Sequence, residues 1–380
     1  MKSMASEQTK IAGLWRSGYA WKGMSLDVSF YLRAIAIVMI MAHNYMHWLP
    51  VSPGENEFGF DKDRVQLFME GVCEHPLDSL RLLASYLGHY GVQVFFFLSA
   101  YGLTKKYGSA IPRWWSFQTR RCKTFYPAII ISGLAYLIYE GVRVGWGVVW
   151  GDDLMYLLRQ MIGLSNFIPD NVYRPIGPWW FIGVILQFYL ILPLVWRVLQ
   201  KYGDKVLYVL LISAWILQSV LGHVLYSEFE LNINHSILGH LGVCAMGIWF
   251  ARHDDIVIPW WLIILSVGLF IGGNFFYVLW IPSRVTLLLF LLPMLCGVCQ
   301  FIAKSDYCHR LLLLLGQLSV YLFLCNGYLR RPIVEWAKHE SYWWTSIWTC
   351  LVFMGIVTVW ALILRMVERR IFLVLGRLRA

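Results

Sequence analysis

The chain has 380 residues and a net charge of +10, and 59% of its residues are hydrophobic while only 14% are charged. A soluble globular domain carries about 25% charged residues, so this composition excludes an ordinary soluble protein and indicates a polytopic membrane protein. The basic residues lie in a few loops between apolar segments. Membrane topology explains that placement, which argues against a nucleic-acid partner.

Ten segments of the chain are long and apolar enough for a transmembrane helix, which needs about 20 mostly apolar residues. We therefore predict an all-α polytopic membrane protein with about ten transmembrane helices. They are expected at 28–50, 84–104, 126–147, 178–198, 205–226, 234–252, 257–278, 284–303, 311–330 and 343–365. One transmembrane domain is predicted over residues 25–370, between an N-terminal tail at 1–24 and a C-terminal tail at 371–380.

The loop charges predict the orientation of these helices. The loop after the second segment holds six basic residues and no acidic one, whereas the loop 51–83 is rich in Asp and Glu. By the positive-inside rule, both termini are expected in the cytoplasm, as an even number of spans requires. The first apolar segment lacks a cleavage site of small residues and is expected to remain as a helix.

The first apolar segment carries three ionisable residues, Arg33, His43 and His47. At about 1.5 Å and 100° per residue, Arg33 and His43 lie about 15 Å apart along the axis and about 80° apart around it. His47 lies one turn beyond His43 on the same face. Ionisable residues inside a membrane usually face a cavity with a function. The alternative is that Arg33 extends to the membrane surface while the histidines bond to neighbouring helices.

No metal is expected, because no Asp, Glu and His residues with ligand spacing occur inside the apolar segments. Cys296 and Cys299 form a CxxC pair, but they lie in an apolar helix with no second pair nearby. They are interpreted as small apolar helix residues.

Five stretches, taken together and in order, resemble the acyltransferase-3 family of integral membrane O-acyltransferases. Residues 32–48, LRAIAIVMIMAHNYMHW, are similar to its first helix, which has an arginine followed by a histidine. The remaining stretches resemble its second helix, a basic loop entering the third helix, its fourth helix and a late helix. They are GVQVFFFLSAYGL (91–103), FQTRRCKTFYPA (117–128), WWFIGVILQFYLILPLV (179–195) and LGQLSVYLFLCNGYL (315–329).

The spacing of the first motif differs from the family pattern. The family has ten residues between its arginine and its histidine, whereas nine separate Arg33 from His43 and Asn44 stands at the usual place. Eleven steps would place the pair within about 20° on the helix, and ten steps do not. Either a local distortion such as a π-bulge realigns the pair, or His47 shares the role. At the late-helix position where the family often has histidine, this chain has Asn326.

The resemblance implies an acyl transfer, most often of acetyl, from cytoplasmic acyl-CoA to a hydroxyl of a cell-surface glycan, glycolipid or lipid-linked saccharide. A neutral imidazole suits the general base, with His43 as first choice and His47 as second. Transfer is expected either directly or through an acyl-histidine intermediate. The donor is a substrate, so no permanently bound cofactor is implied. The expected location is the cell membrane, which in a bacterium is the inner membrane, with lipid around the helices.

Coenzyme A carries several phosphate charges, which arginine binds in bidentate fashion. Arg33, Arg120, Arg121 and Lys123 are therefore expected to hold the donor, although the positive-inside rule alone also accounts for the loop residues. Polar residues inside other helices are candidates for substrate contacts or for interhelical hydrogen bonds, which contribute about 0.6 kcal/mol each. They are Asn44, Ser99, Tyr101, Trp179, Gln187 and Asn326.

Two other functions fit parts of the sequence. A transporter or flippase for a lipid-linked saccharide would also have many helices with buried polar residues, but paired broken helices in two repeated halves are not found. An inactive family member acting as a scaffold would explain the altered spacing of Arg33 and His43.

Overall fold

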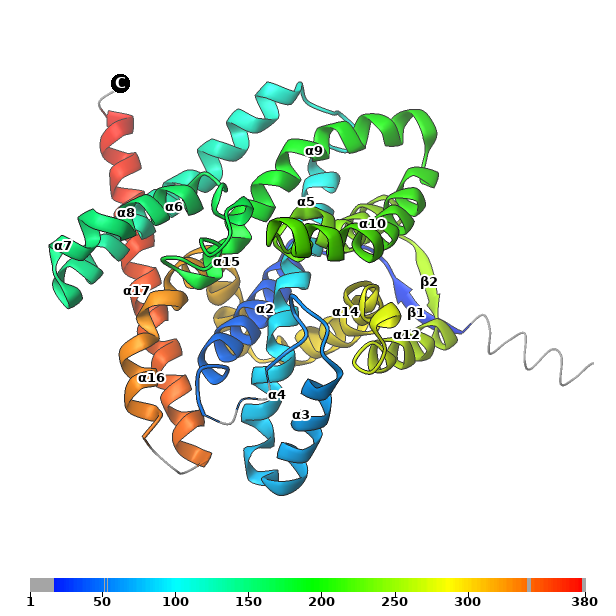
Figure 1. Cartoon of the computed structure of the whole chain (residues 1–380). Coiled ribbons are helices and arrows are strands. Elements are labelled where there is room, and N and C mark those ends of the chain that lie inside the picture. Colours follow the sequence, from blue (N-terminus) through cyan, green and yellow to red (C-terminus); the bar gives the residue numbers. More distant parts are fainter. Residues whose placement is uncertain (1–16, 51, 53, 340–342, 378–380) are drawn as a thin grey trace, which may run out of the picture.

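The computed structural model describes residues 17–50, 52, 54–339 and 343–377, and it is almost entirely helical (Figure 1). Within these residues, eight helical segments are long and apolar enough to cross a membrane. The predicted all-α polytopic membrane architecture is therefore confirmed. The eight segments are Leu26–Met46, Pro76–Tyr107, Trp114–Val144, Gly177–Tyr202, Lys205–Phe229, Ser283–Ile302, Asp306–Leu329 and Trp343–Val374.

The elements follow one another with short connections. The first half of the chain contains β1 (Gly18–Trp21), α2 (Leu26–Met46), α3 (Lys62–Glu74), η1 (Pro76–Asp78), α4 (Ser79–Leu87), η2 (Gly88–Tyr90), α5 (Gly91–Tyr107), α6 (Trp114–Val144), α7 (Trp146–Val148), η3 (Val149–Asp153), α8 (Leu154–Met161) and η4 (Ser165–Phe167). The second half contains η5 (Gly177–Trp179), α9 (Trp180–Tyr202), α10 (Lys205–Phe229), η6 (Ile233–His235), η7 (Ile237–His240), α11 (Leu241–Arg252), β2 (Ile256–Pro259), α12 (Trp260–Gly272), α13 (Tyr277–Trp280), α14 (Ser283–Ile302), α15 (Asp306–Leu329), α16 (Arg331–Ala337) and α17 (Trp343–Arg377).

Two of the ten expected spans are shorter than predicted. The segment expected at 234–252 forms two 3-10 turns and then α11, giving an apolar helical stretch of Ile237–Arg252. The segment expected at 257–278 begins as strand β2, and its helix α12 ends at Gly272, where a second glycine follows. Pro259 and the glycine pair explain these ends, because both residue types are unfavourable inside a helix.

Strands β1 and β2 place two distant parts of the chain on the same side of the membrane. They pair antiparallel, with Gly18 opposite Pro259 and Trp21 opposite Ile256. Paired strands must lie on one side, so an even number of crossings separates them. Five of the long helical segments lie between the strands, and if each crosses once, the shorter stretch Ile237–Arg252 supplies the sixth crossing.

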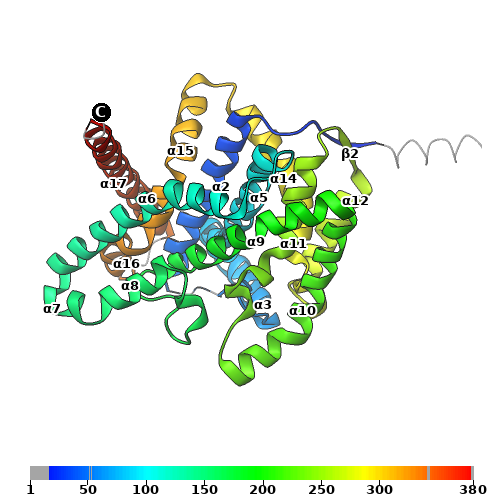
Figure 2. The ribbon, with the colours of Figure 1, turned by 90° about the horizontal axis from the view of Figure 1, so that it is seen from above.

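Helix α2 lies at the centre of the fold, where it packs most extensively against α15 and also against α5 (Figure 2). Gly316 of α15 allows the close approach, since a Cβ at this position would lie 2.1 Å from the carbonyl oxygen of Phe30. Small residues permit such backbone contact between membrane helices, which pack by van der Waals attraction rather than by the hydrophobic effect. The side chains of α2 are thereby fixed against two neighbours.

Helix α6 corrects one prediction about the basic residues. The stretch 117–128, which was expected to be a loop, is helical because α6 begins at Trp114. Pro127 lies inside the helix, and none of the preceding residues 114–126 is a glycine or proline that would delay its start. Arg120, Arg121 and Lys123 therefore stand on a helix.

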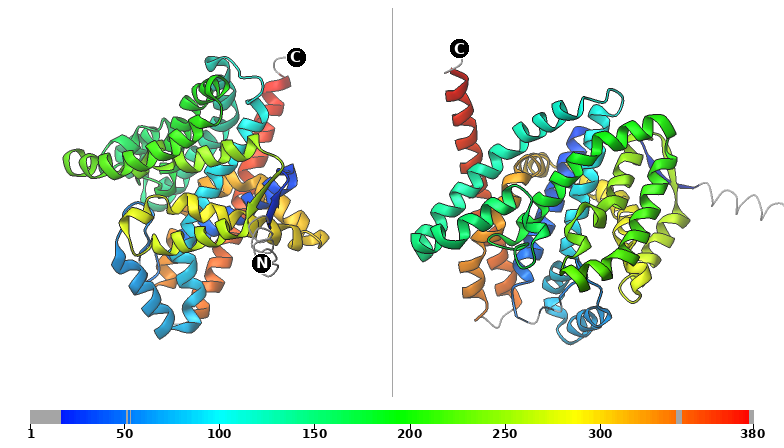
Figure 3. Two further views of the ribbon diagram at one scale, coloured as in Figure 1. Left: turned by 90° about the vertical axis from the view of Figure 1, so that its right-hand side faces the viewer. Right: turned by 45° about the horizontal axis from the view of Figure 1, so that its top comes forward.

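The predicted tails are partly structured. Of the N-terminal tail, residues 1–16 lie outside the described residues, and Gly18–Trp21 form β1. Residues 371–377 extend α17, whose C-terminal turns project beyond the other helices (Figure 3), while 378–380 lie outside the described residues.

Candidate functional site

Two histidines of the first helix lie together at the end of α2 that is followed by the loop 48–61. The ring centroids of His43 and His47 are 5.3 Å apart, as expected for residues one turn apart. His43 is 6% exposed, and its Nδ1 lies 2.8 Å from the carbonyl oxygen of Ser85. A carbonyl only accepts hydrogen bonds, so Nδ1 carries the proton and Nε2 of the neutral ring keeps a free lone pair.

The proposed realignment of Arg33 with His43 does not occur in α2. The helix is a continuous α-helix from Leu26 to Met46, with no π-helical turn. Arg33 and His43 therefore keep their separation of about 80° around the axis. The second alternative, in which His47 lies beside His43, agrees with the observed geometry.

A third histidine, His89 of η2, joins this pair. Its ring centroid lies 5.5 Å from that of His43, and its side chain is 3% exposed. Neither ring nitrogen of His89 has a hydrogen-bond partner among the described residues. Sequence reasoning treated His89 as structural, because nothing in the sequence relates the start of the second apolar segment to the end of the first.

Two acidic residues of the loop 48–61 complete the cluster. Oε2 of Glu55 lies 2.8 Å from Nδ1 of His47. Glu57 is 8% exposed, and ligand atoms of His43, Glu55 and Glu57 all lie within 4.8 Å of one another. We refer to His43, His47, Glu55, Glu57 and His89 as the histidine–glutamate cluster. The sequence placed both glutamates in an outer loop and gave no sign that this loop folds back onto α2.

The surroundings shift the pKa values of the two carboxyl groups in opposite directions. Burial favours the neutral form of Glu55, but the contact with His47 and the nearby His43 outweigh it and lower the pKa of Glu55 to about 2. Burial, followed by the charge of Glu55, raises the pKa of Glu57 well above its ordinary value. The cluster thus combines one charged carboxylate with one carboxyl group that favours its proton.

The loop that carries the glutamates is held in place by α14 and the turn before it. Arg284 donates to the carbonyl oxygen of Glu57 and, over 2.9 Å, to Oδ1 of Asn234. Nε1 of Trp280 donates to the carbonyl oxygen of Asn56 over 2.7 Å. These contacts satisfy backbone acceptors that would be costly to bury without partners.

One glycine sets the distance between η2 and α2. A Cβ added at Gly88 would lie 2.7 Å from both Cβ of His43 and the carbonyl oxygen of Met39, which is closer than real Cβ contacts. We therefore expect Gly88→Ala to push the two elements apart at a cost of about 1–3 kcal/mol and to lower the melting temperature of the purified protein. The matched control is Gly102→Ala, because no atom lies within 4 Å of a Cβ at that position. Equal melting temperatures for the two variants would contradict the expectation.

Asn44 and Asn326 form a polar contact between α2 and α15 next to His43. Nδ2 of Asn44 donates to Oδ1 of Asn326 over 2.7 Å, and Asn326 donates to the carbonyl oxygens of Leu322 and Phe323. Both amide hydrogens of Asn326 are thereby used, whereas Asn44 retains one donor. Arg330 donates to the carbonyl oxygen of Asn44 over 2.8 Å.

The other end of α2 carries a cationic region. Arg33 is half-buried, and its guanidinium lies 5.6 Å from the ring centroid of Phe30. Arg121 of α6 lies 5.9 Å from the ring of Tyr189, and Arg33 also acts electrostatically on the Tyr189 phenol. The fold therefore brings Arg33 and Arg121 to one aromatic residue. Arg120 and Lys123 are exposed on α6.

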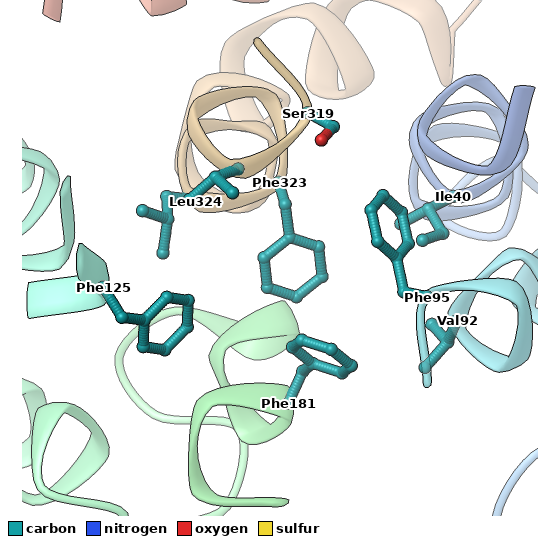
Figure 4. A pocket seen from close by; sticks show the side chains of 9 residues that line it. Ile40, Val92, Phe95, Phe125, Phe181, Ser319, Phe323 and Leu324 are labelled. Carbon is teal, nitrogen blue, oxygen red and sulfur yellow. The ribbon is translucent and has the colours of Figure 1, made fainter. Parts of the chain in front are cut away.

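An apolar pocket lies between the two ends of α2. Its volume is about 40 Å³, and Figure 4 shows the rings of Phe125, Phe181 and Phe323 around it. Ile40, which lies between Arg33 and His43 along α2, forms part of its wall. The lining residues, from α2, α5, α6, α9 and α15, are Ile40, Val92, Phe95, Phe125, Phe181, Ser319, Val320, Phe323 and Leu324.

The other predicted polar residues are spread over the fold. Trp179 donates from Nε1 to the carbonyl oxygen of Leu324 over 2.9 Å, close to Asn326. Oε1 of Gln187 accepts from the backbone N–H of Ile237 over 3.0 Å and so connects α9 with η7. The Tyr101 hydroxyl accepts from the backbone N–H of Met24 over 2.9 Å, near β1 rather than near the histidines. Ser99 is partly buried on α5.

Comparison with known proteins gives one match. A family model for acyltransferase-3, described as an acyltransferase domain, matches residues 26–366. No curated protein matches the chain, and no solved structure matches it either. The matched range contains both ends of α2, the pocket and the histidine–glutamate cluster.

Proposed function

The chain belongs to the acyltransferase-3 family and is a membrane acyltransferase, and from this premise we propose that it moves an acyl group, most simply acetyl, from acyl-CoA to a hydroxyl group. The acceptor would be a cell-surface glycan, glycolipid or lipid-linked saccharide. The membrane would be the cell membrane, which in a bacterium is the inner one. The observation that carries the proposal is a buried imidazole, His43, whose Nδ1 is fixed by Ser85 and whose Nε2 is free.

His43 would act as the general base. Its Nε2 takes the proton of the acceptor hydroxyl while the oxygen attacks the thioester carbonyl carbon. The carbon–sulfur bond then breaks, and the imidazolium returns the proton to the sulfur, giving an ester and free CoA. His47, in contact with Glu55, is the second candidate for the base. Attack by His43 itself, through an acyl-histidine intermediate, would use the same lone pair.

Asn44 would stabilise the oxyanion. Its amide is held by Asn326, and its remaining N–H lies one residue from His43 in the chain. A fixed donor aimed at the developing negative charge needs no reorganisation during the reaction. Asn326 and Trp179 would then be positioning residues, since their donors are used within the protein.

The donor would enter at the cationic end of α2. Arg33 and Arg121, beside Tyr189, would bind the phosphates of CoA, and the exposed Arg120 and Lys123 would attract it electrostatically. The thioester must then reach about 15 Å along α2 from Arg33 to His43. The apolar pocket at Ile40 lies on that path and, when opened, would receive the apolar arm and the acyl group.

The test is to offer labelled acetyl-CoA and a panel of glycans to the purified full-length protein. We expect label on a glycan hydroxyl together with thermal stabilisation by CoA. A ligand at ~100 times its Kd stabilises by about 2.7 kcal/mol. A saccharide transporter would be stabilised by saccharides and not by CoA. Absence of both label and CoA stabilisation would therefore overturn the proposal.

A further inference from the structure

The histidine–glutamate cluster brings together more ligand groups than one proton transfer needs. A ring nitrogen of His43 and carboxylate oxygens of Glu55 and Glu57 lie within 4.8 Å of one another. His47 contacts Glu55 at 2.8 Å, so a fourth ligand group adjoins the same carboxylate. Within the described part of the chain, neither glutamate forms an ion pair with a lysine or arginine. The two carboxylates therefore face each other without a full counter-charge.

His89 gives a second, independent indication of a ligand. Its imidazole is 3% exposed, its ring lies 5.5 Å from that of His43, and both nitrogens lack partners within the described residues. A buried polar group without a hydrogen bond is costly, so such groups usually have a partner such as water or an ion. An ion beside His43 and Glu57 would give His89 such a partner.

We propose that the histidine–glutamate cluster is a binding site for a divalent transition-metal cation, with His43, Glu55 and Glu57 as ligands and His47 or His89 as the fourth. Imidazole nitrogens with carboxylate oxygens suit Zn²⁺, which takes four such ligands at about 2.0–2.2 Å. Mg²⁺ and Ca²⁺ prefer oxygen ligands alone, so they should bind far more weakly.

The surroundings of the cluster match those of metal-binding histidines and carboxylates in other proteins. A ligating histidine usually donates its second ring N–H to a carbonyl or carboxylate, which fixes the ring. His43 does so through Nδ1 to the carbonyl oxygen of Ser85, and Ser85 in turn pairs with Ser52 through their hydroxyl groups. Arg284 holds the backbone of Glu57. The ligand groups thus have fixed supports on η2's neighbour α4 and on α14.

A bound cation would inhibit the acyl transfer, and this consequence rests on the proposed function. The cation takes the lone pair of His43 that would otherwise accept the proton of the acceptor hydroxyl. Zinc is then expected to act as an inhibitor of transfer rather than as a cofactor. Removal of metal by a chelator should raise the transfer rate of a zinc-loaded sample.

Binding can be measured without any acyl transfer, by calorimetric titration of ZnCl₂ into the purified full-length protein in detergent. We expect about one tight equivalent for the wild type and at least tenfold weaker binding for Glu57→Gln. The control is Glu74→Gln, which changes an exposed glutamate at the end of α3 and should bind zinc as the wild type does. Thermal melting checks that each variant is folded, and Glu55→Gln is the second variant if Glu57→Gln does not fold.

The outcomes separate this proposal from the proposed function. Absence of tight zinc binding, or equal binding by Glu57→Gln and Glu55→Gln, would overturn the metal site whether or not the protein transfers acyl groups. Tight zinc binding by a protein that labels no glycan would support the site while leaving transfer unsupported. Tight binding with an undiminished transfer rate would overturn the assignment of His43 as a ligand.

Discussion

Replacing His43 by alanine is expected to lower acyl transfer by about 10²- to 10⁴-fold, the usual contribution of a general base. The side chain is buried at the end of the pocket and oriented by Ser85, so no solvent water is well placed to replace its Nε2. CoA binding should persist, because the cationic end of α2 lies about 15 Å away. The measurements are the initial rate with labelled acetyl-CoA and CoA-dependent thermal stabilisation of the same preparation.

His223→Ala is the control for this substitution, since His223 is exposed on α10 and should tolerate the change. His47→Ala is expected to have a smaller effect than His43→Ala, because His47 contacts Glu55 and is less buried. If His43→Ala and His47→Ala both retain full activity with unchanged melting, neither imidazole is the base.

Arg33→Ala is expected to weaken CoA binding by about 10- to 100-fold. Hydrogen bonds to a charged partner contribute about 1.5–3 kcal/mol, and each 1.4 kcal/mol is a factor of ten in affinity. The loss should appear mainly in KM for acyl-CoA and in the Kd of CoA, with kcat changed much less, because Arg33 lies far from the reacting carbonyl. Calorimetric titration with CoA and steady-state kinetics measure the two quantities.

Arg197→Ala provides the matched comparison for Arg33. Arg197 is an exposed arginine near the C-terminal end of α9, so it tests the general effect of losing one positive charge. Equal weakening by the two substitutions would mean that CoA responds only to net charge. A fall in kcat without a change in KM for Arg33→Ala would instead place Arg33 at the reacting centre.

The sequence predicts the membrane architecture well because a spanning helix depends on local composition. Eight expected segments appear as long apolar helices within the described residues, and both exceptions involve nearby proline or glycine. The basic stretch 117–128 was wrongly expected to be a loop because charge suggests solvent exposure. A helix whose first turns leave the apolar layer is equally compatible with charged side chains.

The candidate site is only partly predictable, because two of its sources are far apart in the sequence. Arg33, His43 and His47 stand in one apolar segment, where their charge is conspicuous. Glu55 and Glu57 look like ordinary acidic residues of an outer loop, and only the contacts of Arg284 and Trp280 with that loop bring them to α2. His89 is likewise placed by the packing of η2 on α2, which no local pattern encodes.

The pairing of β1 with β2 also bears on how the protein is made. Gly18 leaves the ribosome first, but its partner Pro259 follows only after the helices from α2 to α11 have been synthesised. Contacts between such distant positions form late, because the intervening chain must first be ordered. The opening strand therefore waits in water while the translocon inserts six crossings, and its docking would report that this half of the protein has been threaded correctly.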